Sequence, residues 1–551
     1  MARRTGRRLA VVGMATAMTW GAACSSTTTG SSPATTAATT TAAAPTGSTA
    51  AGSSTTTGTA APRPAPPVAP PPGALTWAPC PANGEGAECA TLGVPLDYEH
   101  PAEEQITVAV SRIKAADPAT RLGVLLFNPG GPGGRGLDLP GSIVKGALGN
   151  RAASPLPGAG APTTLARPAD SGADIAMLRR FDLIGFDPRG VGASSPVDCG
   201  DLAGLDQADY EPKDEAGKQA LVATMKAFAA GCATHSGKLL GFVDTESAAH
   251  DLDQLRIALG EEKLNLFGFS YGTSLFSIYA DSFPDRVRAA VLDGAELPKA
   301  DGVALIQEQG VALDALLEKF LGACAARPDC PFFSGGDPGK ALDALQVSLA
   351  AKPLDTPSGP LTVGQATTVV AGAMFSKEVQ PLLEVGLAQA AAGDGSLAAA
   401  GWALYHGRTS DPISNLSEAT VAINCLDFVW PQDDAGYDAL VKETERRAPR
   451  LGSAFLREVL PCAYWPVPPR PRAVPVAEGA PPILVVGTTG DPSTPYAWSE
   501  QMAESLADGH LLTRDGDGHT AWSESRCIDE AIDAYLVTLA LPAPGTRCAT
   551  P

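Results

Sequence analysis

The chain has little positive charge and few histidines. Its 551 residues include 40 lysines and arginines against 60 aspartates and glutamates, which gives a formal net charge of −20. The basic residues form no stripe that would bind a phosphate backbone, so nucleic acid is excluded as a partner. Histidine occurs six times, and no cysteine and histidine positions have the spacing of a zinc site. We therefore expect neither a metal nor another cofactor.

Long hydrophobic runs are also lacking, except at the start of the chain. Four arginines within the first eight residues precede an apolar stretch at 9–20, and small residues follow up to position 23. This stretch is too short to span a membrane and has the order of an export signal, which we place at residues 1–23. Cys24 then stands where a bacterial lipoprotein carries its lipid, although Gly21 occupies a position where leucine is usual. The expected location is the outer face of the cell membrane, with free secretion as the alternative.

A low-complexity segment follows the signal. Residues 24–76 are nearly all serine, threonine, alanine, proline or glycine, and they offer too little apolar surface to offset the entropy of ordering. We interpret the segment as a disordered tether whose proline-rich end, at 66–72, is stiff and extended. Lipidated at Cys24, such a tether would hold the folded part of the chain away from the membrane.

The remaining cysteines are even in number. Eleven are present, and removing Cys24 leaves ten, which suits a protein exported to an oxidising compartment. Neighbours along the chain predict five disulfides, although spacing alone does not fix their connectivity. The predicted pairs are Cys80–Cys89, Cys199–Cys232, Cys324–Cys330, Cys425–Cys462 and Cys527–Cys548.

One short motif carries most of the chemical information. Ser270 lies in Gly268-Phe-Ser-Tyr-Gly272, after an apolar strand candidate at 263–267 and before a helix candidate at 273–280. Glycines two positions before and after the serine allow a sharp strand-to-helix turn, which exposes the hydroxyl above the edge of a sheet. This context predicts that Ser270 is a nucleophile, which requires an acid and a histidine further along the chain.

An acid and a base follow Ser270 in the required order. Asp491 comes after a buried strand candidate at 482–487, and His519 comes after a short strand candidate at 510–514. In such a triad the imidazole takes the serine proton, while the carboxylate fixes the imidazole tautomer and stabilises the imidazolium. Other residues compete for these two roles, but by context they belong to a helix, a strand end or a turn: His250, His510, Asp515 and Asp517.

Backbone donors for an oxyanion are expected in a glycine-rich segment after an early strand. The strand candidate at 122–127 ends in Asn128-Pro-Gly-Gly-Pro-Gly-Gly134. The two prolines have no N–H, which leaves Gly130 or Gly131 as the donor, and we choose Gly131. Tyr271, directly after the predicted nucleophile, would supply the second N–H.

The strand pattern divides the chain into a core and an insertion. Strands and helices alternate over 77–298, which indicates an α/β core with a mostly parallel sheet, and the pattern resumes over 474–551. Between them, residues 299–473 are rich in alanine and leucine and are predicted to form a helical cap. A Pro-, Ala- and Gly-rich insertion at about 141–176 has no predicted role. The further predicted strands are 106–113, 181–186 and 288–292, and the clearest helices of the cap are 310–321, 341–350 and 379–391.

Several longer motifs give the chain a specific resemblance. They are Asn128-Pro-Gly-Gly-Pro-Gly-Gly134, Phe181-Asp-Leu-Ile-Gly-Phe-Asp-Pro-Arg-Gly-Val-Gly192, Gly268-Phe-Ser-Tyr-Gly-Thr273, Ala422-Ile-Asn-Cys-Leu-Asp427 and Gly487-Thr-Thr-Gly-Asp-Pro-Ser-Thr-Pro495. With these motifs the chain resembles the secreted tripeptidyl-aminopeptidase and proline-iminopeptidase branch of the actinobacterial α/β-hydrolases, over most of residues 77–548. The resemblance implies an α/β-hydrolase fold and cleavage of peptides from a free N-terminus, and some relatives are esterases.

Cleavage from a free N-terminus sets a requirement on the substrate site. A free amino terminus is a cation, so an exopeptidase needs a carboxylate that faces its cleft. Asp427 and Glu296 are the candidates, and for each the alternative is a structural role in the cap or in a salt bridge. Tyr464 and Trp465 either wall the pocket or pack the cap.

The prediction from sequence is therefore an exported serine hydrolase that acts on peptides near a free N-terminus through an acyl-enzyme. A carboxylesterase or lipase with the same triad is the first alternative. The second is a surface-binding protein that has the fold without the activity. The sequence leaves the oligomeric state open.

Overall fold

The computed structural model describes residues 71–147, 176–202, 214–405 and 414–549, except residues 85 and 378, together with positions 69, 204, 205, 208 and 212. The predicted signal, Cys24 and most of the tether lie outside the described residues, as do positions 148–175 of the predicted insertion. All the described residues belong to one compact unit, Ala65–Pro551. Among the helices in the described ranges, none is both long enough and apolar enough to cross a membrane.

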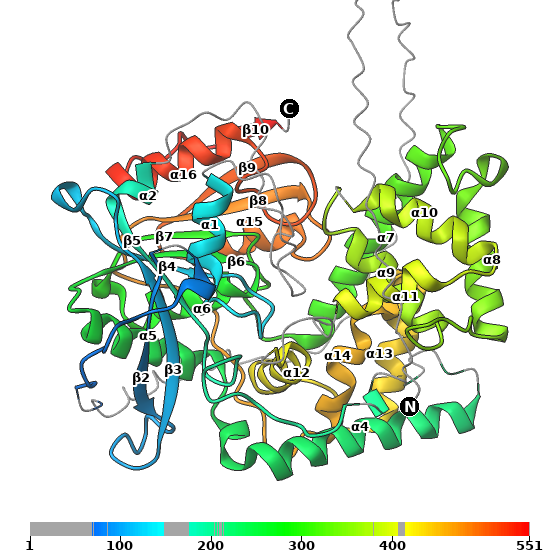
Figure 1. Cartoon of the computed structure of the whole chain (residues 1–551), viewed down its shortest axis with the longest axis horizontal. Coiled ribbons are helices and arrows are strands. Elements are labelled where there is room, and N and C mark those ends of the chain that lie inside the picture. Colours follow the sequence, from blue (N-terminus) through cyan, green and yellow to red (C-terminus); the bar gives the residue numbers. More distant parts are fainter. Residues whose placement is uncertain are drawn as a thin grey trace, which may run out of the picture. The chain divides into compact units, whose positions relative to one another are not determined.

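A ten-stranded sheet forms the centre of this unit, in the order β1-β2-β3-β5-β4-β6-β7-β8-β9-β10 (Figure 1). The pairs β1–β2, β2–β3 and β3–β5 are antiparallel, and every later pair is parallel. The mostly parallel sheet is thus confirmed. The strands are β1 (Ala78–Pro79), β2 (Glu88–Pro95), β3 (Gln105–Ile113), β4 (Gly123–Asn128), β5 (Phe181–Phe186), β6 (Leu264–Phe269), β7 (Val287–Asp293), β8 (Ile483–Gly490), β9 (Gly509–Asp517) and β10 (Arg547–Ala549).

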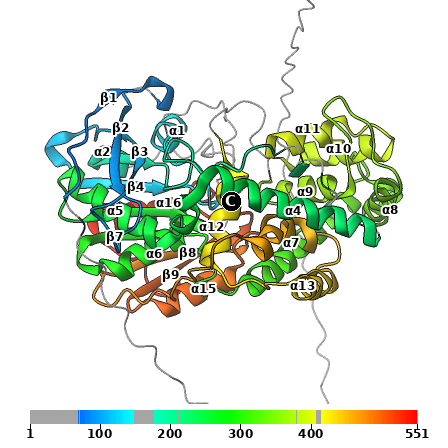
Figure 2. The ribbon, with the colours of Figure 1, turned by 90° about the horizontal axis from the view of Figure 1, so that it is seen from below.

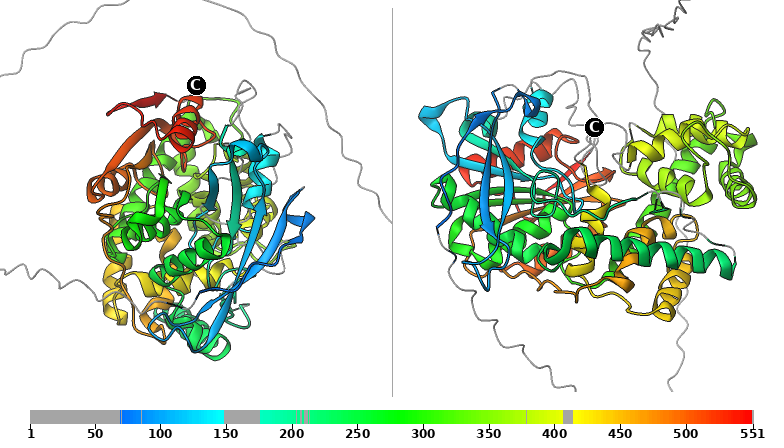
Figure 3. Two further views of the ribbon diagram at one scale, coloured as in Figure 1. Left: turned by 90° about the vertical axis from the view of Figure 1, so that its left-hand side faces the viewer. Right: turned by 60° about the horizontal axis from the view of Figure 1, so that its bottom comes forward.

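The central strands are apolar at nearly every position because helices cover both faces of the sheet. In β4, Leu125 and Phe127 pack with one layer of helices, whereas Val124 and Leu126 pack with the other. Alternation of side chains along a strand accounts for this division, and burial on both faces accounts for the continuous apolar run. The first layer contains α1 (Leu139–Ala147), α2 (Ala176–Arg180) and α16 (Arg526–Thr538); the second contains α5 (Thr245–Leu259), α6 (Tyr271–Ser282) and α15 (Tyr496–Ser505) (Figures 1 and 3). Helix α4 (Glu215–Ser236) lies before α5 in the chain and packs beside the helices that follow β7.

Helices fill the chain between β7 and β8. The described part of 299–473 contributes no strand to the sheet. Two of the three helical runs predicted there fall within α7 and α8, and the third, 379–391, begins one residue before α10. We keep the name helical cap for residues 299–473. Helix α4 of the core extends along this cap and contacts its segment Leu460–Tyr464 (Figure 2). The helices of the cap are α7 (Gly302–Ala325), α8 (Pro338–Ala351), α9 (Val363–Ala373), α10 (Gln380–Ala391), α11 (Ser396–Tyr405), α12 (Leu416–Asp427), α13 (Asp434–Arg447) and α14 (Leu456–Val459).

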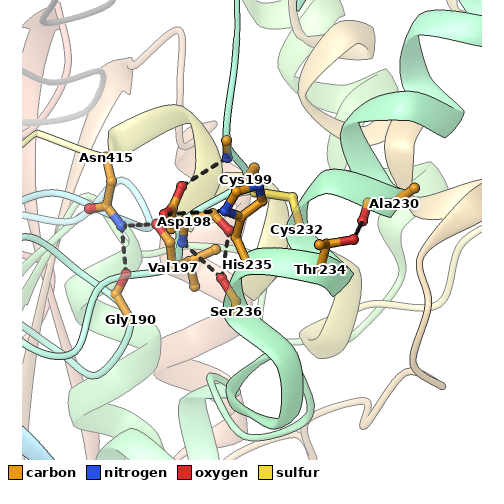
Figure 4. Close-up of a disulfide and its surroundings, with 11 residues drawn as sticks. Gly190, Val197, Asp198, Cys199, Ala230, Cys232, Thr234, His235, Ser236 and Asn415 are labelled. Carbon is orange, nitrogen blue, oxygen red and sulfur yellow. Dashed lines mark hydrogen bonds and ion pairs between the residues drawn. A yellow bond between two sulfur atoms is a disulfide. The ribbon is translucent and has the colours of Figure 1, made fainter.

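The ten remaining cysteines form the five predicted disulfides. One of them, Cys199–Cys232, joins the segment after β5 to α4, close to Asn415 of the cap (Figure 4). There the Asn415 amide, just before α12, donates to the carbonyls of Gly190 and Val197, both at 2.8 Å. The cap is therefore fixed to the core by side-chain hydrogen bonds to the chain that follows a strand of the sheet.

Candidate active site

Ser270 stands on a strained turn between β6 and α6. Its φ of 54° and ψ of −128° place a non-glycine residue in a region that L-residues rarely adopt, as in a nucleophile elbow. Both flanking glycines are needed, because a Cβ at Gly268 would lie 2.4 Å from the carbonyl oxygen of Gly272, and one at Gly272 would lie 2.7 Å from that of Asn128. The backbone conformation at Ser270 thus requires glycine at both 268 and 272.

His519 and Asp491 lie in contact at the same edge of the sheet. The His519 Nδ1 atom is 3.0 Å from each carboxylate oxygen of Asp491, and both side chains are buried. The carboxylate also accepts the N–H groups of Ser493, Thr494 and Thr520 at 2.8–3.1 Å, and the Thr494 hydroxyl at 3.0 Å. These donors fix the carboxylate, which in turn fixes the orientation of the imidazole.

The other imidazole nitrogen of His519, Nε2, is buried and is not held by any partner among the described residues. Ser270, Asp491 and His519 follow β6, β8 and β9, whose carboxyl ends meet at one edge of the parallel sheet. With Nδ1 held by Asp491, Nε2 is the atom that can take a proton from Ser270, in a bond that often tightens only when substrate binds.

A second carboxylate supports this arrangement, and the sequence reasoning missed it. Asp293 ends β7, between the strands that carry Ser270 and Asp491, and it is fully buried. Its carboxylate accepts the N–H groups of Ala521 and Trp522 at 2.8–3.1 Å, and its carbonyl accepts the Ser270 N–H at 3.0 Å. Asp293 therefore joins the elbow to the loop of the histidine. Its place at the carboxyl end of a core strand is a signal in the sequence that could have identified it.

Burial changes the acidity of this second carboxylate. Removal from water raises the pKa of Asp293 to about 7, against the opposing effect of the two N–H groups that it accepts. The group therefore changes charge near neutral pH while it stays in contact with the loop that carries His519.

The glycine-rich segment after β4 lies against the elbow. A Cβ at Gly130 would be 2.7 Å from the Ser270 Cβ, so the two backbones touch. The Gly130 N–H donates to Asn128 Oδ1 at 2.9 Å, which favours Gly131 as the donor to an oxyanion. The Tyr271 N–H is the first of α6 and has no acceptor within the helix. The assignment of the oxyanion hole to Gly131 and Tyr271 stays a prediction that this geometry fits.

Asp427 and Glu296, the candidates for the substrate amine, lie inside the protein. The Asp427 carboxylate accepts the N–H and the hydroxyl of Thr245, and the Thr245 hydroxyl lies 2.6 Å from that of Tyr271. Burial raises the pKa of Asp427 to about 7. Glu296 is ion-paired with Arg472 at 2.6 Å. The role predicted for these carboxylates would therefore require a substrate ammonium to compete with existing partners.

The other residues considered from sequence have partners away from Ser270. His250 packs between Tyr98 and Phe283, and burial lowers its pKa. His510 pairs with Asp508 at 2.8 Å. Of the two turn aspartates, Asp515 pairs with Arg547, and Asp517 pairs with Lys319 of the cap.

A cavity of about 590 Å³ lies between α4 and α13. Its lining includes Met225, Tyr437 and Tyr464, and none of the residues assigned to the triad or to the oxyanion hole. The Tyr464 hydroxyl donates to Asp434. Tyr464 therefore belongs to the packing of this part of the cap.

Comparison with known proteins finds matches over most of the chain. Residues 123–335 match a family model described as alpha/beta hydrolase fold, and residues 448–548 match one described as TAP-like protein. Serine protease Hip1 of Mycobacterium tuberculosis is 34% identical over 508 residues, covering 86% of this chain and 91% of the relative. Tripeptidyl aminopeptidase of Streptomyces coelicolor is 30% identical over 492 residues, covering 86% of each chain. Carboxylesterase B of Mycobacterium tuberculosis is 34% identical over 486 residues, covering 84% and 86%.

The buried Asp293 gives a prediction about stability and pH. Its pKa of about 7 in the folded protein lies above the ordinary 3.8, so between about pH 4 and 7 the folded state keeps a proton that the unfolded chain releases. This group therefore lowers the free energy of unfolding as pH rises through that window, by up to about 1.4 kcal/mol per pH unit. We expect Asp293→Asn to reduce the slope of unfolding free energy against pH in urea unfolding measured at several pH values, because the contribution of this group is lost.

A surface aspartate provides the matched control. Asp281 is exposed and accepts the N–H groups of Val476 and Ala477 at 2.9 and 2.7 Å, so Asp281→Asn also changes a carboxylate that holds two amides. This control should keep the wild-type slope. Equal slopes in wild type and Asp293→Asn would contradict the prediction.

Proposed function

Since the chain belongs to the family of α/β-hydrolases with a TAP-like C-terminal region, and is a serine hydrolase of the peptidase type, we propose that it removes short peptides from a free N-terminus through Ser270, His519 and Asp491. The observation that carries the proposal is the buried His519–Asp491 pair, in which His519 Nε2 has no partner among the described residues. This pair lies at the same edge of the sheet as the turn that carries Ser270.

In the acylation step, Ser270 Oγ gives its proton to His519 Nε2 and bonds to the substrate carbonyl carbon. The oxyanion that forms is stabilised by the N–H groups of Gly131 and Tyr271. The carbon–nitrogen bond then breaks, and the leaving amine takes the proton from Nε2. What remains is an acyl-enzyme on Ser270.

Deacylation repeats the same steps with water. His519 Nε2 removes a proton from the water that attacks the ester carbon, and then returns the proton to Ser270 Oγ. The Asp491 carboxylate stabilises the imidazolium in both halves of the reaction. Apart from the substrate and this water, the chain's own side chains and backbone N–H groups supply every group that the steps require.

The N-terminal preference is the finer part of the proposal. It is supported by the 30% identity with a tripeptidyl aminopeptidase. It is also supported by the carboxylate of Asp427, which is linked to the Tyr271 hydroxyl through the hydroxyl of Thr245. A carboxylate with a pKa of about 7 ionises readily when an ammonium replaces a neutral partner. The relative named carboxylesterase B supports an alternative, in which the same groups cleave esters.

We also propose that the protein is exported and held at the outer face of the membrane by a lipid on Cys24. The charged and apolar start of the sequence supports the export signal, and ten cysteines in five disulfides suit an oxidising compartment. The tether at 24–76 would then give the catalytic part access to peptides outside the cell.

The role of Ser270 can be tested with an activity probe. A fluorophosphonate should label the wild-type protein, whereas Ser270→Ala should remain unlabelled and lose peptidase activity by about 10⁴-fold or more, because the nucleophile is gone. Ser277→Ala is the matched control, since the Ser277 hydroxyl donates to the Ser274 carbonyl within α6. A wild-type protein that does not react with the probe would favour the surface-binding alternative.

The N-terminal preference can be tested with paired substrates. Tripeptidyl anilides with a free amine should be cleaved about tenfold to a hundredfold more efficiently than their N-acetylated forms, because acetylation removes a charge-assisted hydrogen bond. The measurement is kcat/KM for both series and for short-chain esters. If acetylation has no effect, or if only esters react, the aminopeptidase proposal is wrong.

Asp427 can be separated from the triad by kinetics. Asp427→Asn should raise KM for free-amine substrates about tenfold while ester turnover stays close to wild type, since only the former need the negative charge. Thr245→Val is the matched control, because it removes the hydroxyl partner of Asp427 and keeps the carboxyl group itself. Equal losses on amines and esters in Asp427→Asn would show that the carboxylate only supports the fold.

A further inference from the structure

One turn of the cap touches the loop of the catalytic histidine. Phe375 lies between α9 and α10, and its carbonyl accepts the His519 N–H at 3.3 Å. The two rings also meet edge to face, with centroids 5.7 Å apart and planes at 87°. Beside them, Lys319 and Lys377 of the cap reach Asp517 at 2.7 and 3.9 Å. The backbone hydrogen bond and the contact between the two rings thus hold Phe375 next to the imidazole.

Phe375 has the features of a wall rather than of a core residue. It is only half-buried, although it is a large aromatic side chain. Behind it lies the buried Phe455, whose ring meets that of Phe375 edge to face at 6.2 Å. Supported on one side and partly open on another, the Phe375 ring offers an apolar surface beside His519.

The chemistry determines which part of a substrate comes to this place. In acylation, His519 Nε2 takes the proton of Ser270 Oγ and gives it to the leaving nitrogen as the carbon–nitrogen bond breaks. The leaving group must therefore approach the imidazole within hydrogen-bond distance. The acyl part stays bonded to Ser270, whereas the leaving part lies next to the ring that packs on His519.

We propose that Phe375 is a specificity-determining residue, and that its ring forms the apolar wall of the site for the leaving group. A peptide with an apolar residue directly after the scissile bond should then be preferred. This inference rests on the proposed function, because it assumes an acyl-enzyme on Ser270. Phe375 lies in the interval between the two segments matched by the family models, 123–335 and 448–548.

The leaving-group site can be measured apart from the rest of the reaction by trapping the acyl-enzyme with amines. The acyl group is supplied from one activated ester, and leucinamide or glycinamide then competes with water. An amine that attacks the acyl carbon gives its proton to Nε2, which returns it to Ser270 Oγ as the ester bond breaks. The ratio of aminolysis by leucinamide to that by glycinamide reports the preference of this site alone.

We expect wild type to favour leucinamide about tenfold or more, the range observed when one apolar side chain occupies an apolar pocket. In Phe375→Ala the preference should fall to about threefold or less. Phe375→Leu, which keeps an apolar side chain, should lie in between and guards against a variant that does not fold. Lys377→Ala changes an exposed neighbour in the same turn and should keep the wild-type ratio.

The outcomes separate this inference from the proposed function. An unchanged ratio in both Phe375 variants, or a wild-type ratio near one, would overturn the wall at Phe375 while the acyl-enzyme mechanism stands. If esters form the acyl-enzyme and peptides do not, the peptidase proposal fails but the amine ratio still decides the role of Phe375. If neither forms it, both proposals are wrong.

Discussion

The hydrogen bond between His519 and Asp491 is the interaction on which the rest of the site depends. It fixes the imidazole through Nδ1, and Nε2 has no hydrogen-bond partner among the described residues. The bond exists because two loops after neighbouring strands are tied together by backbone N–H groups that converge on one carboxylate. Asp293 extends these ties, since it holds the next turn of the histidine loop and the backbone of Ser270. The site is therefore a set of strand ends bound to one another, with little dependence on any single loop.

The helical cap contacts the core at places that matter for chemistry. Asn415 is bonded to the chain after β5, and Arg472 is paired with Glu296 behind α6. Asp427 reaches Thr245, whose hydroxyl lies beside that of Tyr271. Phe375 contacts His519 itself. These contacts connect the helical cap with the core around Ser270 and His519, so in the proposed function substrate selection would involve both parts.

Much of the core was predictable from local pattern. The seven strands inferred from apolar runs correspond to β3 through β9, because a strand buried on both faces has a continuous apolar sequence. Other elements were not inferred: β1, β2 and β10 are edge or near-edge strands, where a polar face weakens the pattern. The disulfides followed from neighbouring cysteines, since short separations favour closure of small loops.

The sequence by itself determined the elbow at Ser270, because the requirement for glycines and for a strand before a helix is local. It also determined the order of the acid and the base, since each follows its own strand. Only the tertiary structure decided what surrounds them. It brings Asp293 to the histidine loop, engages the Gly130 N–H with Asn128, gives Asp427 and Glu296 interior partners, and places Phe375 against His519. These contacts join residues far apart in the chain or depend on backbone geometry, and no periodicity or motif encodes them.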